Sequence, residues 1–208
     1  MLIAWKYNFI FIHIYKVAGS SINDALWKYT LSPYESLTTR VLRKLKIRVH
    51  SGLFPGHAKA QDIRKILGKE QYEKFFTFAF VRNPWDWQVS LYEYMLQSKN
   101  HYQHSLIKEM RNFEEYIEWR VTQDKHLQKE WVTDEKDNII VDFIGRFENI
   151  NEDFQEICKY LGINETLPYV NRTVNRKPYW YYYNNKTKEM IYQSFKQDID
   201  LFGYNFED

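Results

Sequence analysis

The chain has a single cysteine, Cys158, among its 208 residues. One thiol excludes an internal disulfide, and it also excludes a zinc site built from several cysteines. Cys158 occupies an apolar position in the segment 154–161 (FQEICKYL), so we interpret it as a packing residue rather than a reactive thiol. A chain without internal disulfides suits a reducing compartment, and we expect this protein in the cytoplasm.

Long apolar runs are absent as well. The run from Ile10 to Ile14 is too short to span a membrane, and no small-residue cleavage site follows a longer apolar core. With 7 glycines and 5 prolines, the chain has no linker rich in either residue. We therefore expect a soluble protein without a membrane anchor, folded as one domain over residues 1–208.

The chain has almost no excess of charge, because 29 lysines and arginines face 27 aspartates and glutamates, for a net charge of +2. This balance excludes nucleic-acid binding through bulk positive charge, so any anion must be bound locally. Two interpretations are open for the basic run 36–50, a solvated amphipathic helix or a patch that faces an acidic substrate. Its charges come from Arg40, Arg43, Lys44, Lys46 and Arg48.

Histidine is scarce, with 6 residues in the chain. His101 and His104 are three residues apart, but no carboxylate pair at helical spacing accompanies them, and Glu109 is a weak third ligand. We therefore expect no metal site and a metal-independent activity.

Three apolar segments have the length and composition of strands, namely residues 8–14, 75–81 and 138–144. The first two show little alternation of apolar and polar residues, which is typical of strands buried on both faces of a parallel sheet. A helical pattern follows each segment, so we predict an α/β fold with a central parallel sheet flanked by helices. Such sheets bind ligands beyond the carboxyl ends of their strands.

Local signals place the helices. Ser20 or Ser21 is predicted to cap the helix after the first strand, and Asn83 to cap a helix that begins at Pro84 and ends near Gln97. Further helices are predicted over 61–67 and 101–122, after Asn149 as a cap, and over 187–202 with Gly203 as the stop signal.

The turn after the first strand has the chemistry of an anion site. Ala18, Gly19, Ser20 and Ser21 offer backbone N–H groups at a helix start with little side-chain bulk, and Lys16 adds a mobile charge. The alternative interpretation is an ordinary tight turn with a solvated lysine. The order differs from the triphosphate-binding loop GxxxxGK[ST], in which the lysine follows the second glycine. An ordinary ATPase or GTPase is therefore disfavoured.

The turn after the second strand supplies a guanidinium and a hydroxyl. Arg82 stands at the end of the strand, and Ser90 follows eight residues later, about two turns into the next helix. A guanidinium offers a fork of donors that fits a phosphate, although an arginine at a strand end is often only solvated. Two anion-binding turns on adjacent strands indicate a ligand with two separated phosphate groups.

These segments resemble the sulfotransferases that use 3′-phosphoadenosine 5′-phosphosulfate (PAPS), in particular the carbohydrate sulfotransferases. The similar segments are 13–21 (HIYKVAGSS), 81–92 (VRNPWDWQVSLY), 142–149 (DFIGRFEN) and 198–204 (DIDLFGY). Two positions depart from the family's pattern, because Tyr15 replaces a common proline and Trp87 replaces a common second arginine. Neither departure touches the residues that the resemblance assigns to PAPS.

The resemblance implies a P-loop-like three-layer α/β fold and transfer of a sulfuryl group from PAPS to an acceptor hydroxyl, with adenosine 3′,5′-bisphosphate (PAP) as product. A carbohydrate is the acceptor that this branch favours. By resemblance, Lys16 stabilises the leaving group, and the nucleotide is held by Lys16, Val17, Ala18, Gly19, Ser20, Ser21, Arg82 and Ser90.

His57 is the candidate general base, since it lies on a predicted loop in a segment that resembles one of this branch and its ordinary pKa is near neutrality. A loop histidine bonded to the backbone is the alternative, and Asp86 or Glu148 are other candidates for the base. His13 is interpreted as a core histidine on a buried strand. The segment 175–183 is a candidate acceptor or cofactor wall, or else ordinary aromatic packing.

Two other functions remain open. One is a non-catalytic module that binds a bisphosphonucleotide or a phosphorylated partner, and the other is a kinase on a related α/β scaffold. The position of Lys16 before the glycine disfavours the kinase. The sequence does not determine the acceptor hydroxyl or the oligomeric state.

Overall fold

The computed structural model describes residues 1–30, 55–168 and 176–208. The basic run 36–50 and Asn175 lie outside the described residues. The chain divides into two compact units, each built from two stretches of sequence. We call Met1–Phe80 with Glu130–Asn171 the sheet unit, and Val81–Lys129 with Arg172–Asp208 the helical unit. One domain over 1–208 stays a prediction.

The sheet unit contains a four-stranded sheet in the order β1-β2-β3-β4. Its strands are β1 (Leu2–Ala4), β2 (Phe9–Ile12), β3 (Phe76–Val81) and β4 (Phe143–Arg146). β2 and β3 are parallel, with Phe9 opposite Phe76, and β1 runs antiparallel to β2. All four residues of β2 are buried, as the unbroken apolar run predicts for a central strand.

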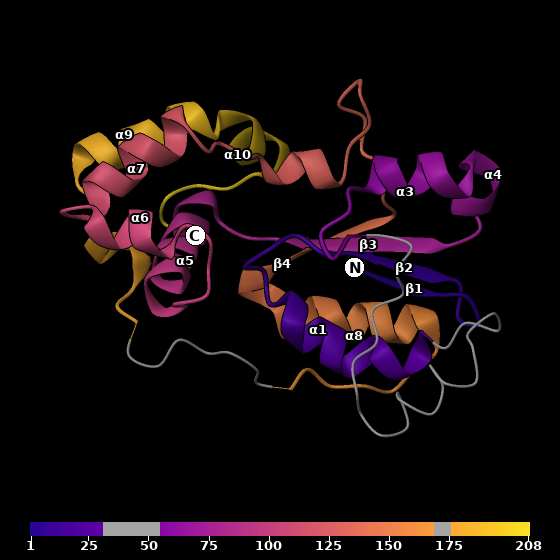
Figure 1. Cartoon of the computed structure of the whole chain (residues 1–208). Helices are drawn as coiled ribbons and strands as arrows, with labels where there is room; N and C mark the ends of the chain where they lie inside the picture. Colours follow the sequence, from indigo (N-terminus) through magenta and orange to yellow (C-terminus); the bar gives the residue numbers. More distant parts are fainter. Residues whose placement is uncertain (31–54, 169–175) are drawn as a thin grey trace. The chain divides into compact units, whose positions relative to one another are not determined.

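Helices cover both faces of this sheet. Figure 1 shows α1 (Gly19–Leu26) and α8 (Ile150–Leu161) on one face and α3 (Ala60–Leu67) and α4 (Lys69–Tyr72) on the other. Short 3₁₀ turns, η1 (Trp27–Tyr29) and η3 (Phe147–Asn149), follow α1 and precede α8. The predicted three-layer α/β fold is confirmed, and Cys158 is buried in α8 as a packing residue.

The helical unit consists of helices and 3₁₀ turns. Its main elements are α5 (Pro84–Gln97), α6 (His104–Glu109), α7 (Phe113–Thr122), η4 (Tyr179–Tyr182), α9 (Asn185–Ser194) and α10 (Lys196–Phe202). The 3₁₀ turn η2 (Gln128–Trp131) crosses the boundary between the units along the chain. The predicted start of α5 is confirmed, since the Asn83 side chain accepts a hydrogen bond from Trp85 N and Pro84 is the first helical residue.

Two predicted helices are each divided in two. The stretch 101–122 forms α6 and α7, and Asn112 caps α7 by accepting from Glu115 N. The stretch 187–202 forms α9 and α10 with Phe195 between them, and Gly203 ends α10 with a φ of 65° as predicted. Phe195 is fully buried, so packing fixes the break between the two helices.

The strand predictions need two corrections. The first strand ends at Ile12, so His13 lies in the following turn rather than on the strand. The third strand is not 138–144 but β4, which begins at Phe143. Ile139 instead pairs with Thr133 in an isolated bridge, and Asp142 accepts hydrogen bonds from Thr77 N and Oγ1 at 2.7 and 2.8 Å. These contacts hold residues 139–142 out of the strand.

Candidate active site

The turn that carries Lys16 joins β2 to α1 through two left-handed residues. Lys16 has a φ of 63° and Ala18 a φ of 60°, and both conformations are uncommon for residues other than glycine. Ala18 is the N-cap of α1 and no side chain caps the helix, so the prediction of Ser20 or Ser21 as the cap is wrong. The first N–H groups of α1 therefore remain available to a ligand, as in other helix starts that bind anions.

Gly19 is needed in this turn because the ring of His13 lies against it. A Cβ atom at Gly19 would stand 1.8 Å from His13 Nε2, which is far inside van der Waals contact. The glycine therefore allows the His13 ring to pack closely against the backbone of the turn. His13 is half-buried and stacks on Phe11, with ring centroids 5.6 Å apart.

His57 lies in the same unit, beside the residues that flank Lys16. Its ring centroid is 4.5 Å from that of His13 and 6.1 Å from that of Tyr15. Its Nδ1 atom is 2.9 Å from the carbonyl oxygen of His13. A carbonyl only accepts, so Nδ1 carries the proton and the neutral ring has its lone pair on Nε2. The structure thus brings the candidate base close to the turn of the candidate lysine.

Both histidines favour the neutral state. Burial lowers the pKa of His13 well below its usual range, with smaller effects in the same direction from the N-terminal ammonium group and from His57. Burial also lowers the pKa of His57, and the hydrogen bond to the His13 backbone opposes that effect. A histidine that is neutral near pH 7 can accept a proton from a hydroxyl group.

Arg82 and Ser90 lie in the helical unit, where Arg82 is 5% exposed. Its Nε and Nη2 atoms are 2.7 and 2.6 Å from Asp86 Oδ2. Arg82 N donates to Gln128 Oε1 at 2.9 Å, and Gln128 Nε2 donates to Arg82 O at 2.7 Å. Ser90 is buried one turn beyond Asp86 on the same helix. Arg82 is therefore fixed through both its backbone and its side chain.

A second arginine completes this cluster. Arg176 Nη2 lies 2.5 Å from Asp86 Oδ1, so one carboxylate bridges two guanidinium groups. Asp86 is thus the hub of a buried ionic cluster in the first turn of α5, in addition to its predicted place near the helix start. The basic start of the segment 175–183 is the only sequence signal for Arg176, and no local pattern connects this residue to Asp86.

Trp87 stands where the family's pattern has a common second arginine, and its side chain is fully buried. The guanidinium of Arg120 lies 5.9 Å from the centroid of the Trp87 ring. In the segment 175–183, Tyr179 is buried, whereas Trp180 and Tyr181 are 55% and 69% exposed. That segment therefore combines packing residues with an exposed aromatic pair.

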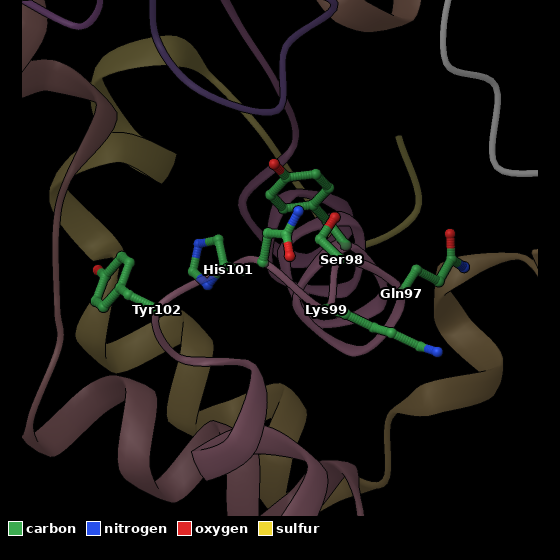
Figure 2. A pocket seen from close by; sticks show the side chains of 7 residues that line it. Gln97, Ser98, Lys99, His101 and Tyr102 are labelled. Carbon is green, nitrogen blue, oxygen red and sulfur yellow. The ribbon is translucent and has the colours of Figure 1, made fainter.

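His101 belongs to a hollow of about 630 Å³ after α5, lined by Tyr94, Gln97, Ser98, Lys99, Asn100, His101 and Tyr102. Figure 2 shows these side chains around the loop that follows the helix. His101 stacks on Tyr102 with centroids 4.7 Å apart. His104 Nδ1 lies 2.8 Å from the carbonyl oxygen of Met95, so packing and backbone contacts account for both histidines.

Within residues 1–30, 55–168 and 176–208, no group of three or more potential ligands is arranged to hold a metal ion. The helices of the same ranges include none that combines the length and the apolar character needed to cross a bilayer.

Comparison with known proteins gives two matches. A family model described as the sulfotransferase family matches residues 1–205. An uncharacterized protein of Archaeoglobus fulgidus is 34% identical over 107 residues, which cover 50% of this chain and 82% of that protein. The family match confirms, for the family as a whole, the resemblance seen in segments 13–21 and 81–92. The chain belongs to the sulfotransferase family, whose reaction is the transfer of a sulfuryl group.

Proposed function

We propose that this protein transfers a sulfuryl group from PAPS to a hydroxyl group of a carbohydrate. The observation that supports this most directly is the position of His57 beside the turn of Lys16. A candidate base, a lysine and a helix start with available N–H groups thus occur together in the sheet unit. Family membership makes sulfuryl transfer the reaction to which these groups are assigned.

The turn from Lys16 to Ser21 fits the 5′ end of the nucleotide. Left-handed residues such as Lys16 and Ala18 turn backbone N–H groups toward a shared concavity, which is an arrangement that binds anions. The α1 dipole adds positive potential at the same point. In this proposal, the N–H groups of residues 17–21 hold the 5′-phosphosulfate, and Lys16 supplies the full positive charge.

The cluster of Arg82, Asp86 and Arg176 fits the 3′-phosphate. Two guanidinium groups and one carboxylate leave one net positive charge at the start of a helix. Asp86 orients both guanidinium groups, so a phosphate meets donors whose positions are already fixed. Ser90, one turn further along α5, would add a hydroxyl donor. This extends the predicted set of Arg82 and Ser90 by one residue, Arg176.

Bound PAPS supplies the activated sulfuryl group and leaves as PAP. His57 Nε2 takes the proton of the acceptor hydroxyl while the acceptor oxygen bonds to sulfur and the bond from sulfur to the bridging phosphate oxygen breaks. Lys16 stabilises the negative charge that develops on that bridging oxygen. The backbone donors contribute by positioning, which is the main source of catalysis in comparable group transfers.

A carbohydrate is proposed as acceptor because the segments resemble the carbohydrate branch of the family. The exposed pair of Trp180 and Tyr181 offers aromatic faces of the kind that stack on sugar rings. No metal ion is assigned a role in the proposed reaction.

The test is an assay with PAPS and a panel of glycans, read by mass spectrometry for an added sulfate and by release of PAP. We expect a sulfated glycan with the wild-type chain and none with Lys16→Ala. Nucleotide binding is measured in parallel by thermal shift with PAP, and with ATP and magnesium. Stabilisation by PAP without transfer to any acceptor would favour the non-catalytic module, and stabilisation by ATP with magnesium alone would favour the kinase.

A further inference from the structure

His57 belongs to an exposed loop, and such a residue needs external contacts to keep one orientation. The ring contacts described above fix its imidazole, but they do not fix its backbone. Two residues of the 3₁₀ turn η2 supply that second attachment. Trp131 Nε1 donates to the carbonyl oxygen of His57 at 2.9 Å, across a separation of 74 residues. Lys59 Nζ forms an ion pair with Glu130 Oε2 at 2.7 Å.

The indole of Trp131 is a rigid support. Trp131 is 6% exposed, and its ring packs edge-on against Tyr15 with centroids 5.4 Å apart. Tyr15 is in turn edge-on to His57, and the Lys59 ammonium group lies 5.6 Å from the Trp131 centroid. Trp131 therefore contacts His57 directly through its N–H group and indirectly through Tyr15, the residue before Lys16.

We propose that Trp131 is a positioning residue that holds His57 with Nε2 presented to the acceptor hydroxyl. The indole N–H fixes the peptide of His57, and the His13 carbonyl then fixes Nδ1 of the ring. Loss of the indole N–H would remove the donor that holds the carbonyl oxygen of His57 from outside the loop. The catalytic consequence of this inference rests on the proposed function. The effect of Trp131 on the orientation of His57 can be measured without any sulfate transfer.

Several ionisable groups face His57 and enter any measurement of its titration. They are the imidazole of His13, the phenol of Tyr15 and the N-terminal ammonium group of Met1, which donates to the Gly56 carbonyl oxygen at 2.7 Å. The ammonium group of Lys59 lies near the ring of Trp131. Trp131→Phe changes none of these groups chemically. A change in the titration of His57 in that variant would therefore report its hydration and orientation.

The experiment compares Trp131→Phe with Trp5→Phe, a matched change in the same unit at a ring that packs on Phe75. We expect kcat to fall about 10- to 100-fold in Trp131→Phe, since small displacements of a catalytic group carry costs of this order. The PAP dissociation constant should stay within about 2-fold, as should kcat in Trp5→Phe, because neither change touches the proposed nucleotide contacts.

Nuclear magnetic resonance of the histidine rings gives a readout that does not need turnover. In the wild type, His57 should be the tautomer protonated on Nδ1, with its signal assigned by His57→Asn. In Trp131→Phe, we expect loss of this single tautomer and a pKa that rises toward the ordinary ~6.5, because the ring gains water. The acidic limb of the kcat/KM profile should move to higher pH by the same amount.

Replacement of Trp131 by β-(3-benzothienyl)alanine removes only the N–H donor and covers the case in which Trp131→Phe fails to fold. An unchanged tautomer and pKa of His57 in this variant would overturn the proposal, whatever happens to turnover. If the wild-type chain transfers no sulfate while the variants at Trp131 show the expected change in the tautomer and pKa of His57, the proposed function is refuted. The structural role of Trp131 is then retained.

Discussion

In the sheet unit, the turn from Lys16 to Ser21 offers backbone N–H groups and one lysine, next to two histidines whose pKa values are lowered by partial burial. In the helical unit, Asp86 forms ion pairs with both Arg82 and Arg176. The first region is held in shape by backbone conformation and the second by charge.

This difference suggests a division of labour. Backbone donors at a helix start have fixed positions and add little net charge, so in the proposed function they suit the end of PAPS where bonds change. Paired guanidinium groups hold a phosphate strongly but contribute nothing specific to the transition state. Changes in the sheet unit should therefore appear in turnover, and changes in the helical unit in nucleotide affinity and in stability.

The largest effect is expected for Lys16→Ala. We predict a loss of kcat of at least about 10³-fold, because a charge that acts on the leaving oxygen is removed from the transition state. The dissociation constant for PAP, measured by calorimetry, should rise less than about 10-fold, since the backbone donors remain. Arg176→Gln should show the opposite pattern, with weaker PAP binding and a kcat close to that of the wild type. Equal losses of kcat in the two variants would refute the division of labour.

Asp86→Asn should have the next largest effect. The change leaves two arginines without their shared carboxylate in a cluster where Arg82 is almost completely buried. We expect the free energy of unfolding to fall by about 3–5 kcal/mol, as measured by urea denaturation. Millimolar PAP or pyrophosphate should restore more stability to this variant than to the wild type, because an anion replaces the lost charge. A variant that anions stabilise no more than the wild type would show that the cluster does not bind phosphate.

Local chemistry was sufficient to predict some of this molecule from its sequence. The start of α5 follows from Asn83 and Pro84, and the end of α10 follows from Gly203, because each signal acts within one turn of the helix. The buried strands β2 and β3 were equally clear, since their apolar runs have few alternatives. The turn after β2 and the turn after β3 could be found because they follow directly from these strands and helices.

Contacts between distant residues account for what the sequence did not reveal. The bond from Arg176 to Asp86 spans 90 residues, and the bond from Trp131 to His57 spans 74. No local pattern indicates either partner. The left-handed conformation of Ala18 was missed for a different reason, because non-glycine residues rarely adopt it and the sequence instead offered Ser20 and Ser21 as caps.

Gly19→Ala tests how the sheet unit depends on close packing. The new Cβ would collide with the ring of His13, and relief of the collision requires that ring to move. We expect the free energy of unfolding to fall by about 1–3 kcal/mol and kcat to fall with it, because the His13 carbonyl holds His57. Gly56→Ala is the matched control, since its added Cβ meets no atom within 4 Å. Equal stability of the two variants would contradict the packing of His13 on Gly19.

The smallest effect is a dependence of stability on pH that comes from His13. Because burial lowers the pKa of His13 in the folded state, the unfolded chain binds a proton more readily. The stabilising contribution is therefore complete above the unfolded pKa of ~6.5 and declines as the pH falls below it. For one histidine, the slope cannot exceed about 1.4 kcal/mol per pH unit.

Urea denaturation between pH 7.5 and pH 5.5 measures this slope in the wild type and in His13→Asn. The variant loses packing at every pH, but only the titration of His13 changes the slope, so the two effects separate. We expect a shallower slope in His13→Asn. A steeper slope in His13→Asn than in the wild type would contradict a neutral His13 in the folded state.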